Sequence, residues 1–313
     1  MRFKITLTLI VLLIILGLIT YFSERDQVRE KEAAEKRSKI YTHFKSGEVM
    51  GIEIKTKDRK VSLEKKEGRW LVSLNGSYYL ADKDAVGNIF QTVEDMKREN
   101  VVSTDPSKYP VFELDQENGV EVKLIRLDNT AIAHFFVGKN GPDLFSTYIR
   151  VQGEKEVLLL SGILKDKFDK ELKDWRDKTI FNLKAEDITM VEIISHKKKI
   201  SLKKGEKGNW EMVEPEKAKV KKEAVEGLVN ALATLKAYDF EDGADLKVAG
   251  LINPSTRIQI GMKDNSTFEL FIGKDKDTSK KYVKRSDSPT VFLVQNYDLE
   301  PILKDASELK EKP

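Results

Sequence analysis

The sequence predicts an α+β protein made of two tandem homologous units of mostly antiparallel sheet, each with one main amphipathic helix, preceded by a single transmembrane helix. Three observations predict this arrangement. An uncharged apolar segment stands near the amino terminus, a pattern of strands and one helix occurs twice at a nearly constant offset, and the turns between strands are short. Short turns favour antiparallel pairing. The 313 residues suffice for two domains of ordinary size.

The amino terminus has the features of an uncleaved membrane anchor. Residues 5–22 carry no charge and as a helix would be roughly 27 Å long, close to the hydrocarbon thickness of a bilayer. Arg2 and Lys4 precede this segment, so the positive-inside rule keeps the terminus in the cytoplasm and the bulk of the chain outside it. A cleaved signal peptide, the alternative, would end in small residues, whereas Tyr21 and Phe22 stand here. We therefore expect a single-pass protein of the cytoplasmic membrane.

Composition excludes several classes of protein. The chain has no cysteine, which excludes a disulfide framework, a thiolate metal site and a cysteine nucleophile. Its 55 basic and 52 acidic side chains give a net charge of +3, without the basic excess of a nucleic-acid binder. Residues 24–39 are almost wholly charged and contain neither glycine nor proline. They predict a solvated helix that continues the anchor as a stalk.

The remainder of the chain is one unit that occurs twice. Two alternating strand patterns in the first half match two in the second at an offset of 139 residues: residues 49–54 with 188–193, and 60–65 with 199–204. A glycine and a tryptophan follow in each copy: Gly68 and Trp70, then Gly208 and Trp210. The clearest match is an amphipathic helix, whose apolar positions are Ala85, Val86, Ile89, Phe90, Val93 and Met96 in one copy and Ala224, Val225, Leu228, Val229, Leu232 and Leu235 in the other.

Further strand pairs follow the helix in both copies. They turn at residues 128–129 and 264–265, both Asp-Asn, which is good turn chemistry. Each unit is thus predicted to contain two strands, a helix and about four more strands. The predicted segments are a cytoplasmic stub (1–4), an anchor (5–22), a stalk (23–47), a first repeat (48–165), a connector (166–186), a second repeat (187–305) and a tail (306–313).

Several motifs of the second half resemble an uncharacterised bacterial family, domain of unknown function 4340. These motifs lie at residues 175–181, 208–210, 250–254, 271–274 and 282–284. The resemblance is clearest over residues 175–300 and weaker in the first copy, where residues 112–115 lack the glycine and proline of the second. The resemblance implies a membrane-anchored envelope accessory protein of the kind found beside ABC-type transport components linked to gliding motility. It implies no catalytic residues, because the family has none established.

The histidines are the first candidates for chemistry. His43, His134 and His196 could in principle bind a metal or act as general bases, but no two have the spacing of a metal site. His134 corresponds to Glu269 in the other copy, and His196 corresponds to Lys57. We expect surface or strand-face histidines.

Two further patterns resemble ligand loops. Residues 138–139 and 273–274, both Gly-Lys, resemble the end of a phosphate-binding loop but lack its first glycine and its hydroxyl residue. We expect glycine turns that end strands. Residues 115–119 and 275–277 carry alternating acids, but neither has the full ligand pattern of a calcium loop. Solvated turns are the simpler interpretation.

The last candidates for a binding site are the repeated aromatic residues and the lysine runs. Trp70 and Trp210, like Tyr148 and Tyr282, recur in both copies, which favours core positions over a ligand groove. The lysine runs at residues 197–199 and 221–222 contain no aromatic residues, so we expect solvated faces.

The sequence therefore predicts a protein without catalytic, cofactor-binding or metal-binding residues and without a cofactor. We expect a non-catalytic scaffold or accessory subunit of an ABC-type transport assembly, whose partners are the membrane, through residues 5–22, and other envelope or transporter proteins. Nucleic acid is not an expected partner. The alternative is an extracytoplasmic module that binds a lipid, glycan or peptide in the cleft between the repeats. An enzyme of unknown class is the third hypothesis.

Overall fold

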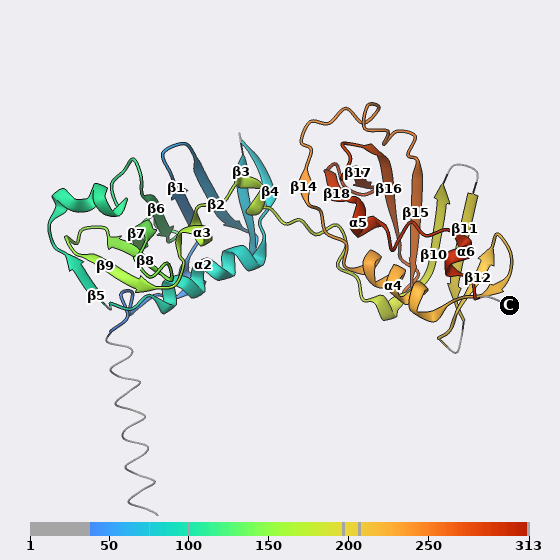
Figure 1. Ribbon diagram of the computed structural model, residues 1–313, viewed down its shortest axis with the longest axis horizontal. Helices are drawn as coiled ribbons and strands as arrows, with labels where there is room; N and C mark the ends of the chain where they lie inside the picture. The colour runs from blue at the N-terminus through green and yellow to red at the C-terminus, as the bar shows by residue number, and fades with distance from the viewer. Residues whose placement is uncertain (1–37, 75, 99, 196–197, 206–207, 312–313) are drawn as a thin grey trace, which may run out of the picture. The chain divides into compact units, whose positions relative to one another are not determined.

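The computed structural model describes residues 38–74, 76–98, 100–195, 198–205 and 208–311 (Figure 1). The chain divides into two compact units, Met1–Asp177 and Lys178–Pro313. The predicted stub and anchor and most of the stalk lie outside the described residues. Within the described part of the chain, no helix is long and apolar enough to cross a membrane.

The first unit is a nine-stranded antiparallel sheet with the helix α2 (Lys83–Asp95) on one face. Its strands are β1 (Gly51–Lys55), β2 (Lys60–Lys66), β3 (Arg69–Leu74), β4 (Ser77–Leu80), β5 (Asn100–Ser103), β6 (Val120–Ile125), β7 (Ala131–Asn140), β8 (Ser146–Val151) and β9 (Val157–Ser161). Their order across the sheet is β4-β3-β2-β1-β6-β7-β8-β9-β5. Short helices are η1 (Ser46–Glu48), η2 (Pro106–Phe112), α3 (Lys165–Phe168) and η3 (Leu172–Asp174).

The second unit repeats this topology, with the helix α4 (Lys222–Ala233) in the place of α2. Its strands are β10 (Ile188–Ser195), β11 (Lys198–Lys204), β12 (Trp210–Glu214), β13 (Ala218–Lys219), β14 (Asp239–Phe240), β15 (Thr256–Met262), β16 (Thr267–Asp275), β17 (Lys280–Arg285) and β18 (Val291–Gln295). Short helices are η4 (Ala185–Asp187), α5 (Asn296–Leu299) and α6 (Ala306–Leu309). The order β13-β12-β11-β10-β15-β16-β17-β18-β14 is that of the first sheet, which confirms two homologous α+β units.

The strand register also repeats. Ile52 of β1 lies opposite Leu63 of β2, and Val191 of β10 lies opposite Leu202 of β11, each position 139 residues after its counterpart. All four side chains are buried beneath the helix of their unit, because alternate residues of each strand point to the same face.

Each sheet has more strands than the sequence predicts. The two strands after the first hairpin and the edge strand after the helix are absent from the predicted pattern. The edge strands β13 and β14 have two residues each, too short for an alternation to be detected. β13 pairs with the neighbouring strand β12, whereas the pairing of β14 with β18 joins residues more than 50 apart, which a local pattern does not carry.

The helix of the first unit begins at a clear cap. The Oδ1 atom of Asp82 accepts hydrogen bonds from the backbone N–H groups of Asp84 and Ala85, both at 2.8 Å, which satisfies two donors of the first turn. The apolar positions predicted from the sequence form its buried face. In α4 the capping position is Lys221, whose side chain makes no such bond, so the apolar face positions that helix.

The carboxyl-terminal boundary of each unit differs from the sequence prediction. The predicted first repeat ends at residue 165, yet the fully buried Trp175 closes the first unit, and its carbonyl oxygen accepts from the N–H of Asp82 at 2.8 Å. The predicted tail contains Leu309, also fully buried, whose carbonyl oxygen accepts from the N–H of Lys221 at 2.8 Å. Residues 166–177 and 300–311 are therefore equivalent parts of the repeat, so neither residues 166–177 nor residues 306–311 lie outside the folded units.

The amino-terminal boundary shifts in the same way. The N–H of Ile40 donates to the carbonyl oxygen of Met96 at 2.9 Å, and that of Ile180 donates to the carbonyl oxygen of Leu235 at 2.9 Å. Residues 38–47, predicted as part of the stalk, thus pack against the first core, as residues 178–187 do in the second. Isolated bridges of this kind have no periodicity by which a sequence could reveal them.

Candidate functional site

His134 lies on the face of the first sheet that points away from α2. Its Nε2 atom is 2.8 Å from Oε1 of Glu121, and its ring stacks on Phe136 at a centroid distance of 5.9 Å. At the equivalent positions of the second unit, Glu269 pairs with Arg257 at 3.4 Å, so the acidic residue stands on the other strand of the pair. We therefore interpret His134 as one member of a cross-strand side-chain pair, which the second unit forms with Arg257 and Glu269 instead.

The other histidines do not join it. His43 is exposed at the start of the first unit, and His196 lies outside the described residues. In the described part of the chain, no group of three or more His, Asp or Glu side chains is placed to hold a metal ion.

Replacing Tyr41 with phenylalanine is expected to destabilise the first unit by about 1–3 kcal/mol. The hydroxyl of Tyr41 donates to the carbonyl oxygen of His134 at 3.0 Å and accepts from its N–H at 3.2 Å. The change removes the acceptor of this part-buried N–H, whereas the carbonyl oxygen keeps the N–H of Gln152 at 2.9 Å. Burial also raises the pKa of Tyr41 well above its usual range. Chemical denaturation measures the loss, with Tyr78→Phe, at an exposed tyrosine of the same unit, as the control. Equal stability of the two variants would contradict this account.

The paired glycines do not end strands. Gly138 lies within β7 and Gly273 within β16, at a register shift against the next strand. A Cβ atom on Gly138 would lie 2.1 Å from the carbonyl oxygen of Phe112, and one on Gly273 would lie 2.2 Å from that of Ala249. The prediction that these glycines form turns at the ends of strands is therefore wrong, because both lie inside a strand. These glycines let a preceding loop lie directly against a strand.

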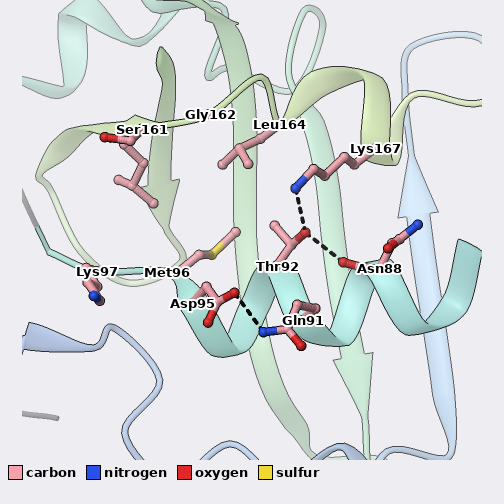
Figure 2. Close-up of a pocket in the computed structure, with 11 residues that line it drawn as sticks. Asn88, Gln91, Thr92, Asp95, Met96, Lys97, Ser161, Gly162, Leu164 and Lys167 are labelled. Atoms are coloured by element: carbon pink, nitrogen blue, oxygen red, sulfur yellow. Dashed lines mark hydrogen bonds between the residues drawn. The ribbon is translucent and has the colours of Figure 1, made fainter. Parts of the chain in front are cut away.

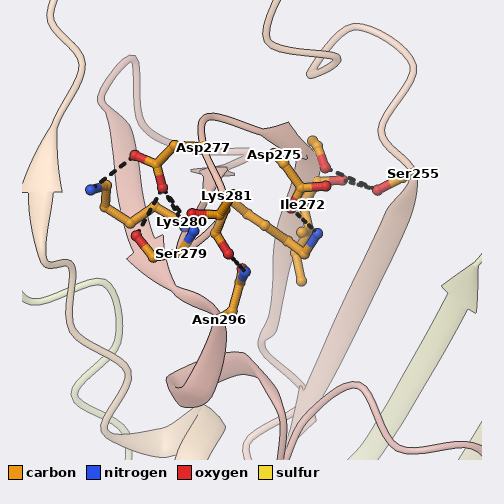
Figure 3. Close-up of polar contacts among 10 residues, drawn as sticks. Ser255, Ile272, Asp275, Asp277, Ser279, Lys280, Lys281 and Asn296 are labelled. Carbon is orange, nitrogen blue, oxygen red and sulfur yellow. Dashed lines mark hydrogen bonds and ion pairs between the residues drawn. The ribbon is translucent and has the colours of Figure 1, made fainter.

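Both acidic motifs form turns. The Oδ1 atom of Asp115 accepts from the N–H groups of Glu117 and Asn118 at 2.8 and 3.0 Å. In the second motif Oδ1 of Asp277 accepts from the N–H and hydroxyl of Ser279, both at 2.8 Å (Figure 3). The N–H of Ser279, with the ammonium of Lys280, holds the pKa of Asp277 well below its usual range.

The repeated aromatics pack against apolar side chains. Trp70 is half-buried and contacts Phe90 at a ring distance of 5.7 Å. Tyr148 packs on Phe112 at 4.7 Å, and Tyr282 belongs to the corresponding small cluster of the second unit. Trp210 is likewise packed against its core.

The lysine runs make surface contacts. Lys199 lies 3.3 Å from both Glu192 and Glu214, and Lys221 donates to the carbonyl oxygen of Glu308 at 3.1 Å. Lys197 lies outside the described residues.

A cavity that the sequence did not indicate lies between α2 and the segment after β9 (Figure 2). Its volume is about 150 Å³. The ammonium of Lys167 donates to Oγ1 of Thr92 at 3.2 Å, and that hydroxyl donates to the carbonyl oxygen of Asn88 at 2.6 Å. Apolar lining comes from Met96, Leu160 and Leu164, while Lys97 and Lys167 add positive charge and Asp95 adds negative charge.

The turn between β7 and β8 presents an exposed apolar tip beside this cavity. The Oδ1 atom of Asp143 accepts from the N–H groups of Phe145 and Ser146 at 3.1 and 3.0 Å, which fixes the turn. Leu144 is 67% exposed and Phe145 is 74% exposed. The backbone of Leu144 has a φ of 62°, a left-handed conformation that disfavours leucine. The Gly162 N–H donates to the carbonyl oxygen of Phe145 at 2.7 Å and connects the tip to the cavity rim.

Comparison with protein families gives a match over most of the chain. The model of a family described as a domain of unknown function, DUF4340, matches residues 73–254 and 210–313. The chain belongs to the DUF4340 family. The two matches begin in β3 and β12, which are equivalent strands of the two units, in keeping with an internal repeat. No curated protein and no solved structure matches the chain.

The two units differ at the tip. Asp277 fixes the same turn in the second unit, but it is followed by Thr278 and Ser279 where the first unit has Leu144 and Phe145. The cavity differs as well, because Ala231 stands at the position of Thr92. The sequence signal for the tip is this difference between the two copies, because motifs that both copies share do not include it.

Proposed function

We propose that this DUF4340 protein is a non-catalytic, membrane-anchored envelope protein that serves as a scaffold or accessory subunit of an ABC-type transport assembly. The observation that carries the proposal is the edge strand β5. It ends the first sheet and exposes Val101 at 48% and Val102 at 41%. An exposed apolar edge can take up an additional strand from a partner protein.

The equivalent edge of the second unit is built differently. Its strand β14 has two residues, of which Phe240 packs into the core, and the next residue, Glu241, forms an ion pair with Lys276 at 2.9 Å. Short and charged edges avoid association. The contrast supports a partner for the first unit.

Anchoring and the transport context have separate support. The uncharged residues 5–22, preceded by Arg2 and Lys4, favour a span of the cytoplasmic membrane with the two units outside the cytoplasm. The transport context is supported by the family resemblance. A small-ligand function is less well supported, because this cavity of about 150 Å³, like one of about 270 Å³ lined by Asp187 and Met262, is smaller than ligand pockets of roughly 300–1,000 Å³.

Site-specific photo-cross-linking tests the proposal. A benzophenone amino acid at Val102 in the full chain should form adducts with a permease or ATPase subunit of an ABC transporter, identified by mass spectrometry. The same residue at Glu241, which directly follows the edge strand β14 of the second unit, is the matched control and should give at most a tenth of the adduct. Absence of any transporter subunit from the Val102 adducts, with the protein folded and in the membrane, would contradict the proposal.

A further inference from the structure

We propose that the apolar tip formed by Leu144, Phe145 and Ile163 inserts into the lipid interface of the bilayer, so that the first unit rests on the membrane. This inference rests on the proposed anchoring through residues 5–22 and adds a second membrane contact made by the folded unit.

The tip lies close to the point where the amino-terminal segment joins the first unit. The carbonyl oxygen of Ser38, the first described residue, accepts from the N–H of Arg98 at 2.7 Å. The neighbouring Lys97 lines the cavity together with Gly162 (Figure 2), and Gly162 donates to the carbonyl oxygen of Phe145. Residues 23–37 join the uncharged segment to Ser38, and a linker of this length reaches at most about 50 Å. An anchor ending at residue 22 therefore limits how far this edge can lie from the bilayer.

The chemistry of the tip suits an interface between lipid and water. Phenylalanine and leucine partition into the boundary between headgroups and acyl chains, and exposed large apolar side chains are unfavourable in water. Ile163, 40% exposed, adds a third apolar side chain. The cavity beside the tip is lined by two lysines, Lys97 and Lys167, and by one acidic residue, Asp95, so positive charge is in excess there and favours anionic headgroups.

The second unit shows that the turn does not require these apolar residues. Asp277 holds the equivalent turn (Figure 3). The N–H of Asn296 donates to the carbonyl oxygen of Ser279 at 2.8 Å, as that of Gly162 does to Phe145. Tyr297 stands at the position of Ile163 and is also exposed, so the difference is confined to the two turn residues. The same fold thus carries an apolar tip in the unit that follows the anchor and a hydroxyl tip in the other.

The absence of cysteine from the chain permits a direct test with single probes. Phe145→Cys and Ser279→Cys, at equivalent turn positions, are labelled with an environment-sensitive fluorophore in the full chain. Both are reconstituted in vesicles of phosphatidylethanolamine and phosphatidylglycerol. We expect a blue-shifted emission at position 145 and at least twofold stronger quenching by spin-labelled lipid than at position 279. Equal quenching by aqueous iodide at the two positions would overturn the inference.

Two further measurements keep the inference separate from the proposed anchor. Failure of the protein to float with the vesicles would refute the anchor. Flotation with an aqueous probe at position 145 would refute the tip alone. The double variant Leu144→Asn, Phe145→Ser keeps the turn, because asparagine tolerates a positive φ and serine occupies this turn in the second unit. With it, a probe at Ile163→Cys should lose its lipid quenching; unchanged quenching would count against insertion by the tip.

Discussion

Replacing Trp175 with alanine is expected to lower the free energy of unfolding of the first unit by about 3–5 kcal/mol. The indole is fully buried in the first core, together with Phe168, and its removal leaves a cavity that the surrounding strands can fill only in part. The hydrogen bond from Asp82 to the carbonyl oxygen of residue 175 survives, so the loss reports packing. Urea denaturation gives the change, and hydrogen exchange assigns it to residues 38–177.

The equivalent substitution in the second unit is Leu309→Ala. Leu309→Ala should cost that unit about 2–5 kcal/mol, because Leu309 closes its core at the corresponding place. The control for Trp175→Ala is Asp166→Ala, at an exposed position of residues 166–177. It should change the stability of the first unit by less than about 0.5 kcal/mol. If Trp175→Ala cost no more than this control, residues 166–177 would behave as the connector that the sequence predicts.

The repeat could be predicted because its central elements are periodic. The alternation through Ile52 and Leu63 and the one-faced helix around Ile89 place the same side chains in the core that the structure buries. Periodicity does not reveal the ends of each unit, because there the chain is joined to the rest of the unit by isolated single-pair bridges, Ala81 with Arg176 and Val220 with Lys310. Trp175 and Leu309 occupy equivalent places with different side chains, so neither local pattern nor residue identity reveals their common role.

The candidate surfaces escaped prediction for a different reason. Motifs common to both copies, such as the Gly-Lys pairs, report what the fold needs, and the structure explains Gly138 by its backbone contact. Specific surfaces should instead occur where one copy departs from the other. Phe145 against Ser279 and Val102 against Glu241 are departures of this kind. Their importance depends on exposure, which the aligned sequences alone do not give.

Replacing Gly138 with alanine is expected to destabilise the first unit by about 1–3 kcal/mol. The added Cβ would lie 2.1 Å from the carbonyl oxygen of Phe112 and 3.1 Å from the side chain of Leu114, so a backbone segment has to move. Gly273→Ala should have the same effect on the second unit, where the clash is with the carbonyl oxygen of Ala249 at 2.2 Å. Thermal unfolding, assigned to one unit or the other by hydrogen exchange, measures both.

A glycine with free space around it provides the control for these variants. Gly87 lies inside α2, and a Cβ there would meet nothing within 4 Å. Gly87→Ala should therefore stabilise the first unit by about 0.5–1 kcal/mol, since alanine is the better helix former. Opposite signs for Gly87→Ala and Gly138→Ala in one unit would separate steric contact from the general effect of losing a glycine. If both were stabilising, the loop would not lie against the strand as described, and the Gly-Lys pairs would need another explanation.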